Sequence, residues 1–489
     1  MKILLAGYNL DYDLIKELKD KSALSQDITP ETISAAYARI SRSPKPVDEL
    51  REIARGEVEK ARKSNRSIVF EMGHSSVAEH TVFNIDVIGV SRLLIEEIEK
   101  FRLCSYTEKS QRYVLFNKDF VIPEEIKQAG QTDLFIDTIG RQNDYYHQLY
   151  EQLRPHVFAE NKALAENPAN RSLLEGWAKE DARYTIALAT ETQLGMTINA
   201  RNLELMLRRL AATPLAEAQD YSKKLFTATK DIAPSLIRYT EATDYDRLTR
   251  LHLQKQAAIF SKKYQHGSVA KKSPAVQLAF VTPDADTRAA AALLFSASAL
   301  NYKQCLAQAA RLNPREKKAL FKTTFEHIKA HDAVLRELEN IDLQFELVMS
   351  ASCFAQLKRH RMATIISQDY DPQLGVTIPP AIREIGQQKQ FLKIMHETQC
   401  AYEQIKKKAP LAATYVLTNA HRKRVLMKLN ARELYHLARL RADGHAQWDI
   451  RKLSEEMLKK AKKVMPLTLL LAGGKDSFAA LYRKTFPHI

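Results

Sequence analysis

The second half of this 489-residue chain repeats the order of motifs in its first half, and this repetition constrains the fold more than any other feature. The segments Met1–Asp11 and Ala275–Asp286 are both short apolar runs that lead into a turn, and a helical pattern follows each. Self-similarity of this length indicates duplication of one folding unit. Later matches are Asn199-Ala-Arg201 with Asn430-Ala-Arg432, and Ala218-Gln219 with Ala446-Gln447.

We therefore expect two domains, residues 1–240 and 275–489, joined by a helical linker over 241–274 that ends in the polar segment Lys262–Pro274. The length agrees, because chains divide into units of about 100–200 residues. Each domain should begin with a strand and continue with a charged amphipathic helix, near residues 47–64 in the first and 312–333 in the second.

Composition narrows the class of protein. The chain has 74 Lys and Arg against 58 Asp and Glu, so its net charge of +16 favours anionic partners. The basic residues are dispersed and no nucleic-acid motif is present, so we expect phosphorylated small molecules rather than nucleic acid. No apolar run reaches the roughly 18–20 residues of a bilayer span, and we expect a cytoplasmic protein with no membrane contact. Four widely spaced cysteines indicate reduced thiols and no metal site.

A polar run in the first half follows a helical pattern. Leu94, Ile98 and Phe101 are spaced for one buried helix face, so Arg102 and Ser105 should come where that helix gives way to a loop. The run Thr107–Tyr113 that follows can then reach a ligand.

A second polar run, Gln356-Leu-Lys-Arg359-His360-Arg361, lies in the second half. Further on, Asn430 suits a helix N-cap, and Leu434 and Leu437 should pack inward. Arg432 and His436 are four residues apart and share the other helix face, which can present cations to a cofactor.

These runs resemble the flavin-dependent thymidylate synthases, whose pattern is Arg-His-Arg-x-x-Ser-x-Asn-Glu-x-Ser-x-Arg-Tyr. The first half departs from it at Lys100, Phe101 and Thr107, while the second half keeps Arg359-His360-Arg361 and loses the rest. Ser76-Val-Ala-Glu-His80 is also similar to the family. The other matching residues are Arg102, Ser105, Glu108, Ser110, Arg112, Tyr113, Asp181-Ala-Arg183, Asn430-Ala-Arg432, Arg441 and Ala446-Gln447-Trp-Asp-Ile-Arg451.

The resemblance implies an α+β protein made of two tandem copies of the flavin-dependent thymidylate synthase fold, each helix-rich with a small central sheet. It implies conversion of dUMP to dTMP, with carbon from methylenetetrahydrofolate and hydride from NADPH through FAD. Family members are homotetramers with sites between subunits. A homodimer of this chain would form a pseudo-tetramer of the same kind.

The resemblance also assigns site residues, and the two halves have complementary losses. The catalytic residues would be Arg359, His360 and Ser110, with a cation beside the isoalloxazine to stabilise developing negative charge. Arg112 and Arg183 would hold the phosphate, because a guanidinium forks two hydrogen bonds onto it. The remaining dUMP contacts would be Gln356, Arg359, Glu108, Ser110 and Arg441, and the FAD contacts His80, Arg359, His360, Arg361, Glu108, Asn430, Arg432 and His436.

Together the halves reconstitute one complete nucleotide site. The reciprocal combination has lost its phosphate-binding arginines. An Asp in place of such an Arg replaces attraction by repulsion, each worth up to about 4 kcal/mol at 4 Å and an effective dielectric near 20. We therefore expect one composite site per duplicated pair. The reciprocal set is Glu97, Lys100, Phe101 and Leu210 with Ser367, Asp369, Asp371 and Thr414.

Several alternatives stay open. Glu108 can be only an ion-pair partner of Arg112, and His80 can be a buried core histidine. Leu469–Ser477 resembles the phosphate loop of PP-loop pyrophosphatases, but only twelve residues follow it, which favours coincidence or a tail contact. The chain can also be a catalytically inactive nucleotide- or flavin-binding paralogue, or a flavin-dependent methyltransferase of another uridine, including one in RNA.

Overall fold

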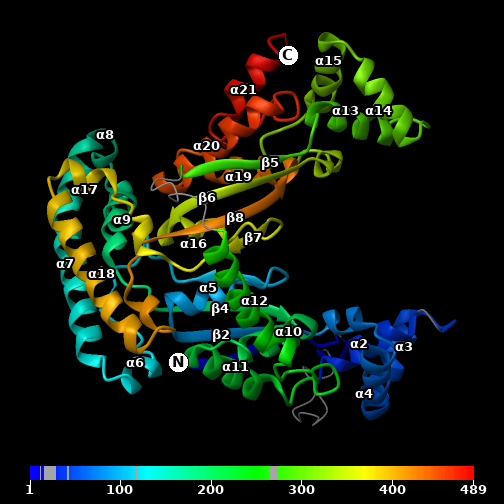
Figure 1. Cartoon of the computed structure of the whole chain (residues 1–489). Coiled ribbons are helices and arrows are strands. Elements are labelled where there is room, and N and C mark those ends of the chain that lie inside the picture. The colour runs from blue at the N-terminus through cyan, green and yellow to red at the C-terminus, as the bar shows by residue number, and fades with distance from the viewer. Residues whose placement is uncertain (12, 16–28, 41–42, 117, 265–273, 489) are drawn as a thin grey trace. The chain divides into compact units, whose positions relative to one another are not determined.

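Both halves of the chain fold around a four-stranded antiparallel sheet with the same strand order. The computed structural model describes residues 1–11, 13–15, 29–40, 43–116, 118–264 and 274–488, and its strand orders are β1-β2-β4-β3 and β5-β6-β8-β7 (Figure 1). The first strand pair of each sheet has a bulge at the equivalent place, between Leu5 and Gly7 and between Leu278 and Phe280. The predicted duplication and the helix-rich α+β class are confirmed.

Short turns of 3₁₀ or π-helix, labelled η, occur among the helices and strands of the first half. Its elements in chain order are β1 (Lys2–Tyr8), α2 (Glu31–Arg39), α3 (Val47–Gly56), α4 (Val58–Arg66), η2 (Ser67–Glu71), η3 (Ser75–His80), β2 (Val82–Ser91), α5 (Arg92–Ile98), β3 (Ser105–Glu108), α6 (Glu124–Gln128), α7 (Thr132–Glu160), α8 (Lys162–Ala165), η4 (Pro168–Asn170), α9 (Arg171–Ala182), η5 (Arg183–Thr185), β4 (Glu191–Asn199), α10 (Ala200–Ala211), α11 (Ala216–Thr229) and α12 (Asp244–Lys263).

The second half repeats this order with fewer helices between its strands. Its elements are β5 (Val276–Val281), α13 (Ala285–Ser296), α14 (Tyr302–Arg311), α15 (Pro314–Phe325), η6 (Arg336–Asn340), β6 (Asp342–Ser350), α16 (Ala351–Leu357), β7 (Thr364–Ser367), η7 (Pro372–Leu374), α17 (Pro380–Glu384), α18 (Gln388–Lys408), η8 (Ala413–Val416), β8 (Arg422–Asn430), α19 (Ala431–Arg441), α20 (Trp448–Val464) and α21 (Phe478–Thr485).

One face of each sheet forms the core, because apolar residues alternate along the central strands and alternate side chains point to opposite faces. In the first sheet Phe83 and Ile85 of β2 and Met196 of β4 are buried, and α10 packs against them through Leu203 and Leu207. The second sheet repeats this pattern with Leu343, Phe345, Leu347, Val425, Met427, Leu429, Leu434 and Leu437.

Several predicted boundaries need correction. The helix expected near 47–64 is two helices, because the backbone at Glu57 leaves the helical region at φ −135° and ψ 60°. The helix expected near 312–333 is shorter, and it begins after a capping box at Asn313. Ser105 begins strand β3, which pairs with β4, where a loop was expected. The linker is helical to Lys263, and residues 265–273 lie outside the described part of the chain.

The predicted match of Ala218-Gln219 with Ala446-Gln447 is wrong. Helix α11 begins after Leu215 and α20 begins after Gln447, so these two cap positions correspond. Glu217 and Asp449 are then equivalent, two residues further along each helix.

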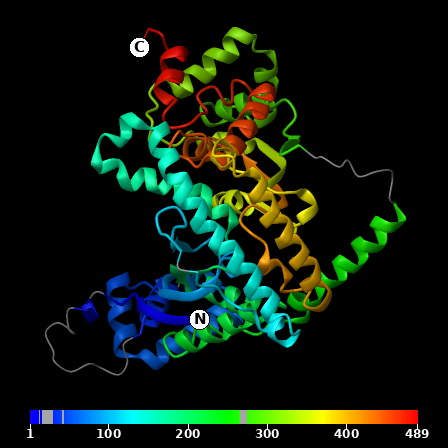
Figure 2. The same cartoon turned by 90° about the vertical axis from the view of Figure 1, so that its left-hand side faces the viewer.

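Contacts between residues divide the chain into two compact units, and each unit includes segments from both halves of the sequence. Unit 1 comprises Met1–Lys179, Ile186–Gly267 and His396–Leu417, and unit 2 comprises Glu180–Thr185, Ser268–Met395 and Thr418–Ile489. Each half therefore contributes one short segment to the unit built mainly from the other half. Within unit 1, Gln142 of α7 donates to Thr398 Oγ1 of α18 at 2.8 Å, and Figures 1 and 2 show these helices side by side.

No helix in the part of the chain that the structure describes is long and apolar enough to cross a membrane. All four cysteines are free thiols, and only Cys400 is exposed. Among the described residues, no group of three or more His, Cys, Asp or Glu side chains is placed to hold a metal ion.

Candidate functional site

The segment that carries Asp181-Ala-Arg183 belongs to unit 2, where hydrogen bonds to its main chain fix it. Asn419 Nδ2 donates to the carbonyl oxygen of Arg183 at 2.9 Å, and the N–H of Ala420 donates to the carbonyl oxygen of Tyr184 at 3.0 Å. Arg183 is 6% exposed. A phosphate-binding candidate from the first half of the sequence is thus grouped with the candidates of the second half.

Gln356, His360 and Arg441 lie together in unit 2. Arg441 Nε donates to His360 Nε2 at 3.2 Å, and its Nη2 donates to the Gln356 carbonyl oxygen at 3.4 Å. The sequence separates Arg441 from His360 by strands and helices, and the fold returns α19 to the end of α16. The contact orients the Arg441 guanidinium, which is the group predicted to bind the nucleotide.

His360 is neutral in this arrangement. Its ring is almost completely buried, its Nδ1 lies 3.1 Å from Glu433 Oε1, and its Nε2 accepts from Arg441, so the proton lies on Nδ1. Burial lowers the pKa of His360, and the hydrogen bond to Glu433 opposes this only in part. His360 therefore positions Arg441, and the cation predicted beside a flavin has to come from another residue.

Arg359 and Arg361 flank His360 on the turn that ends α16. The N–H of Arg361 donates to the Arg359 carbonyl oxygen at 3.0 Å, and that of Ala363 donates to the His360 carbonyl oxygen at 3.2 Å. This tight turn buries the central imidazole and leaves both arginine side chains exposed. Arg359 and Arg361 are accordingly the accessible cations of the Arg-His-Arg run.

Asn430 and Arg432 have structural partners. Asn430 is an N-cap, as predicted, because its Oδ1 accepts from the Glu433 N–H at 2.8 Å. Arg432 donates to Glu339 Oε1 and to the carbonyl oxygen of Val334, both at 2.9 Å. The helix face that was expected to present two cations therefore exposes mainly His436, whose ring lies edge-on to His360 at 5.8 Å.

Glu108, Ser110 and Arg112 belong to unit 1. The Glu108 carboxylate lies 3.6 Å from the guanidinium of Arg92, and both side chains are buried. Ser110 Oγ accepts from the Arg112 N–H at 3.1 Å, which closes a tight turn after β3. The Arg112 guanidinium lies 5.9 Å from the centre of the Tyr113 ring.

His80 is an exposed residue at the end of η3, so it is not the buried core histidine of the alternative interpretation. Its ring packs edge-on against Tyr37 at 4.7 Å. Nearby Glu79 pairs with Arg201, as Glu339 pairs with Arg432 in the second half. His80 thus occupies the place that Asn340 has in the other repeat.

The positions in unit 1 that mirror this cluster do not present the same charges. Glu97 pairs with Lys100 at 2.6 Å where Gln356 and Arg359 stand in unit 2. Leu210, the counterpart of Arg441, is buried in the apolar core. Thr414 stands where Arg183 does, and it belongs to unit 1.

Four further residues of unit 2 complete the cluster: Tyr184, Gln447, Trp448 and Asp449. The sequence motifs assigned no role to them. The Tyr184 hydroxyl donates to Asp449 Oδ2 at 3.0 Å and accepts from Gln447 Nε2 at 3.0 Å. Trp448 stacks on Tyr184 and donates from Nε1 to Asp181 Oδ1 at 2.7 Å. Burial raises the pKa of Asp181 to about 7. The available signal was their adjacency to the Asp-Ala-Arg and Ala-Gln motifs.

The segment Gly473-Gly474-Lys475 packs against the loop at Ala442 and does not have the structure of a phosphate loop. No strand precedes it, and Leu469 is buried in the core of unit 2. A Cβ on Gly474 would overlap the Ala442 carbonyl oxygen, so close packing against that loop requires glycine there.

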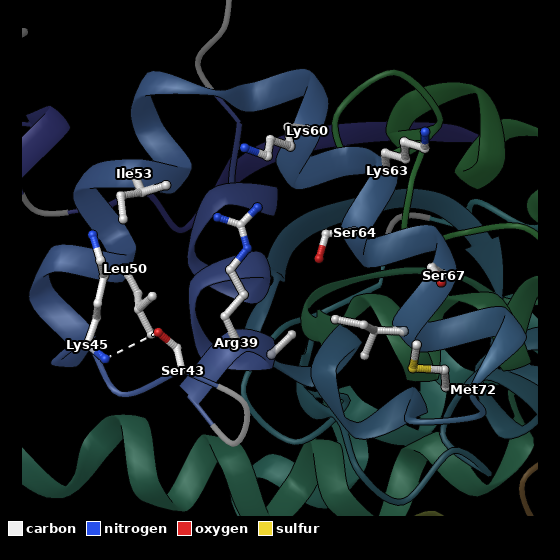
Figure 3. A pocket seen from close by; sticks show the side chains of 12 residues that line it. Arg39, Ser43, Lys45, Leu50, Ile53, Lys60, Lys63, Ser64, Ser67 and Met72 are labelled. Carbon is white, nitrogen blue, oxygen red and sulfur yellow. Dashed lines mark hydrogen bonds between the residues drawn. The ribbon is translucent and has the colours of Figure 1, made fainter.

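Residues of helices α2 to α4 and of η2 in unit 1 line a separate, open pocket of about 560 Å³ (Figure 3). The apolar residues Ala35, Ala36, Leu50, Ala54 and Ala61 form a small buried cluster between these helices. Figure 3 shows Arg39 and Lys60 pointing toward one another with Ser64 beside them. None of the predicted site residues lines this pocket.

Comparison with known proteins agrees with these motifs. The family model described as thymidylate synthase complementing protein matches residues 23–235 and again 277–467. A flavin-dependent thymidylate synthase of Clostridium tetani is 30% identical over 215 residues, which are 43% of this chain and 82% of that protein.

Some relatives match over most of this chain as well as most of their own length. A UPF0159 protein of Chlamydia muridarum is 24% identical over 425 residues, 84% of this chain and 80% of that protein. A UPF0159 protein of Thermoplasma acidophilum is 23% identical over 477 residues, 88% and 93% of the two chains. A solved flavin-dependent thymidylate synthase of Helicobacter pylori, complexed with FAD and dUMP, overlaps 49% of this chain and all of that chain, with 21% identity and a TM-score of 0.29.

The family model matches each repeat separately and together the two matches cover most of the sequence. The chain therefore belongs to the thymidylate synthase complementing protein family, the flavin-dependent thymidylate synthases, as a member with two tandem copies of the family unit.

Proposed function

We propose that this chain is an FAD-dependent thymidylate synthase, which makes dTMP from dUMP with methylenetetrahydrofolate and NADPH at one composite site per duplicated pair. The observation that carries the proposal is the grouping of Arg183 with Gln356, His360 and Arg441 in unit 2. These residues come from both halves of the sequence. Thr414, Glu97, Phe101 and Leu210 replace them in unit 1.

In this proposal the nucleotide is held by charge and by fixed hydrogen-bond directions. Arg183 grips the phosphate, because a guanidinium group binds phosphate in two-point geometry. Arg441 and Gln356 orient the uracil ring. The His360 and Gln356 acceptors that constrain Arg441 support this role, since a pre-oriented arginine loses less freedom on binding.

The residues of unit 2 suit a flavin dinucleotide in part. The exposed arginines Arg359 and Arg361 and the exposed His436 provide positive or hydrogen-bonding groups for a diphosphate and for a reduced ring. Asn430 and Arg432 instead support the helix and the turn beneath them. FAD, when bound, supplies the redox chemistry that no side chain of the protein can supply.

A catalytically inactive binding protein is the second candidate. Thr107 replaces the family Asn, and two relatives that match over most of their length carry the name UPF0159 protein, which states no activity. Retention of every predicted nucleotide contact across the two halves favours the enzyme.

One experiment separates the two. The purified protein is examined for a bound-flavin spectrum, and NADPH oxidation and dTMP formation are followed with and without dUMP and methylenetetrahydrofolate. We expect flavin absorbance and dTMP formed only when all substrates are present. A flavin-bound protein without turnover would support the binding protein, and a protein that takes up no FAD would overturn both the enzyme and a flavin-binding protein.

A further inference from the structure

The carboxylate of Asp449 joins two parts of unit 2. Its Oδ2 accepts from Ser350 Oγ at 2.6 Å and from the Tyr184 hydroxyl at 3.0 Å. Ser350 and Tyr184 are completely buried, so water does not compete for these bonds. A single carboxylate oxygen therefore ties the segment Glu180–Thr185 to the start of α16.

The Ser350 side of this contact leads to Gln356. Ser350 caps α16, since its Oγ accepts from the Cys353 N–H at 3.0 Å, and α16 carries Gln356 in its last turn. A second link runs in parallel, because Gln447 accepts from Gln356 Nε2 at 3.4 Å and donates to the Tyr184 hydroxyl at 3.0 Å.

The Tyr184 side leads to Arg183, the residue before it. The carbonyl oxygens of both residues accept hydrogen bonds from Asn419 and Ala420, and the Tyr184 ring stacks on Trp448 with centroids 5.6 Å apart. With its ring and its main chain held, Tyr184 leaves little freedom to the arginine beside it.

We propose that Asp449 is a positioning residue that, through Tyr184 and Ser350, fixes Arg183 relative to Gln356. This inference rests on the proposed function for its effect on dUMP, since Arg183 is there the phosphate contact and Gln356 the base contact. The geometric part, that Asp449 holds the segment Glu180–Thr185 in place, stands without it.

The charge of the site is consistent with this role. Burial raises the pKa of Asp449, while the hydrogen bonds from Ser350 and Tyr184 and the positive charge of Arg422 act in the opposite direction. The carboxyl group is thus held by the same two hydroxyls that it connects.

Unit 1 contains the matched arrangement without the arginine. Glu217 accepts from Ser91 Oγ at 2.6 Å and from the Tyr415 hydroxyl at 2.7 Å, and Ser91 caps α5. The residue before Tyr415 is Thr414, the counterpart of Arg183. Substitutions in unit 1 therefore remove equivalent buried hydrogen bonds next to a position with no predicted contact to dUMP.

The test compares Tyr184→Phe and Asp449→Asn with Tyr415→Phe and Glu217→Gln in the full, FAD-loaded chain. We expect the unit 2 variants to raise the dissociation constant and KM for dUMP about five- to thirty-fold, with a smaller change in kcat. The unit 1 variants should lower the thermal midpoint similarly but leave dUMP affinity within about two-fold, an order-of-magnitude expectation. Asp449→Glu, which keeps the carboxylate, should restore most of the affinity.

Hydrogen exchange measured on peptides that cover residues 180–185 supplies the second readout. Faster exchange there in Tyr184→Phe and Asp449→Asn, and not in Tyr415→Phe, supports the proposal. Unchanged exchange in the unit 2 variants, or equal loss of dUMP affinity in all four variants, would overturn it. If the wild-type chain binds neither FAD nor dUMP, the proposed function fails, and the exchange result alone decides whether Asp449 fixes the segment.

Discussion

Replacing Arg183 by threonine introduces the residue that the other repeat has at the equivalent position, Thr414. Arg183 is 6% exposed, and its main chain is held by Asn419 and Ala420, so the substitution removes the side chain without freeing the segment. Arg183→Thr should therefore test the phosphate contact with little disturbance of the fold.

The size of the effect follows from the burial of the guanidinium. A phosphate and a cation 4 Å apart attract by about 4 kcal/mol at an effective dielectric near 20. Desolvation of Arg183 offsets part of this, and hydrogen bonds to charged groups contribute about 1.5–3 kcal/mol net. A loss of about 2–3 kcal/mol corresponds to a roughly 30- to 150-fold increase in the dissociation constant for dUMP.

Calorimetric titration of the FAD-loaded protein measures this constant, and deoxyuridine, which lacks the phosphate, is the internal control. Arg183→Thr should weaken dUMP strongly and deoxyuridine hardly at all. Thr414→Ala, at the equivalent position of the other repeat, should change neither. Equal loss of affinity for dUMP and deoxyuridine would show that Arg183 supports the fold of the site and does not contact phosphate.

Three further predictions concern other parts of the site. Arg359→Ala should weaken the affinity for FAD about ten-fold, because this side chain is the cation proposed for the isoalloxazine ring. Since the side chain is exposed, the thermal midpoint of the FAD-free protein should stay unchanged. The flavin absorbance of the purified protein measures the loss of FAD. His360→Ala should raise the dUMP dissociation constant by about ten-fold through loss of the acceptor that orients Arg441, and a larger effect on flavin content than on dUMP binding would contradict this role. The pKa of Asp181 is about 7 in the folded chain and near 3.8 in the unfolded chain, so its stabilising contribution is complete below pH 4 and is lost as pH rises through 7. This amounts to at most about 4 kcal/mol, and Asp181→Asn should flatten the fall in thermal midpoint between pH 5 and pH 8.

The first strand of each repeat and one helix cap followed from local sequence. Short apolar runs indicated β1 and β5, and Asn430 was recognisable as an N-cap because its role depends only on the next three residues. Burial of Leu434 and Leu437 followed from helical spacing in the same way. These features depend on neighbours in the chain, which a single sequence displays.

Partners that come from distant segments were not predictable. Glu433 and Arg441 contact His360 from a helix more than seventy residues away. Burial of the ring, together with the charge of Arg441, keeps His360 neutral, whereas the motif alone suggested a cation. The partner of Arg432, Glu339, also comes from a distant segment, so its ion pair was not predictable either. Residue types at matched positions do not specify which groups the fold brings into contact.

The match of Ala218-Gln219 with Ala446-Gln447 failed for a related reason. Two common residues in the same order carry little information about where a helix begins. The shared role of Glu217 and Asp449, each of which accepts from a capping serine and a tyrosine, identifies the correct alignment, but it needs contacts that only the folded chain provides.

The central claim is that the duplicated chain retains one nucleotide site and has lost the other. The stoichiometry of dUMP binding to the FAD-loaded protein, measured by calorimetric titration, tests this most directly. One dUMP per chain is the predicted result, and two equivalent dUMP molecules per chain, or none, would contradict it.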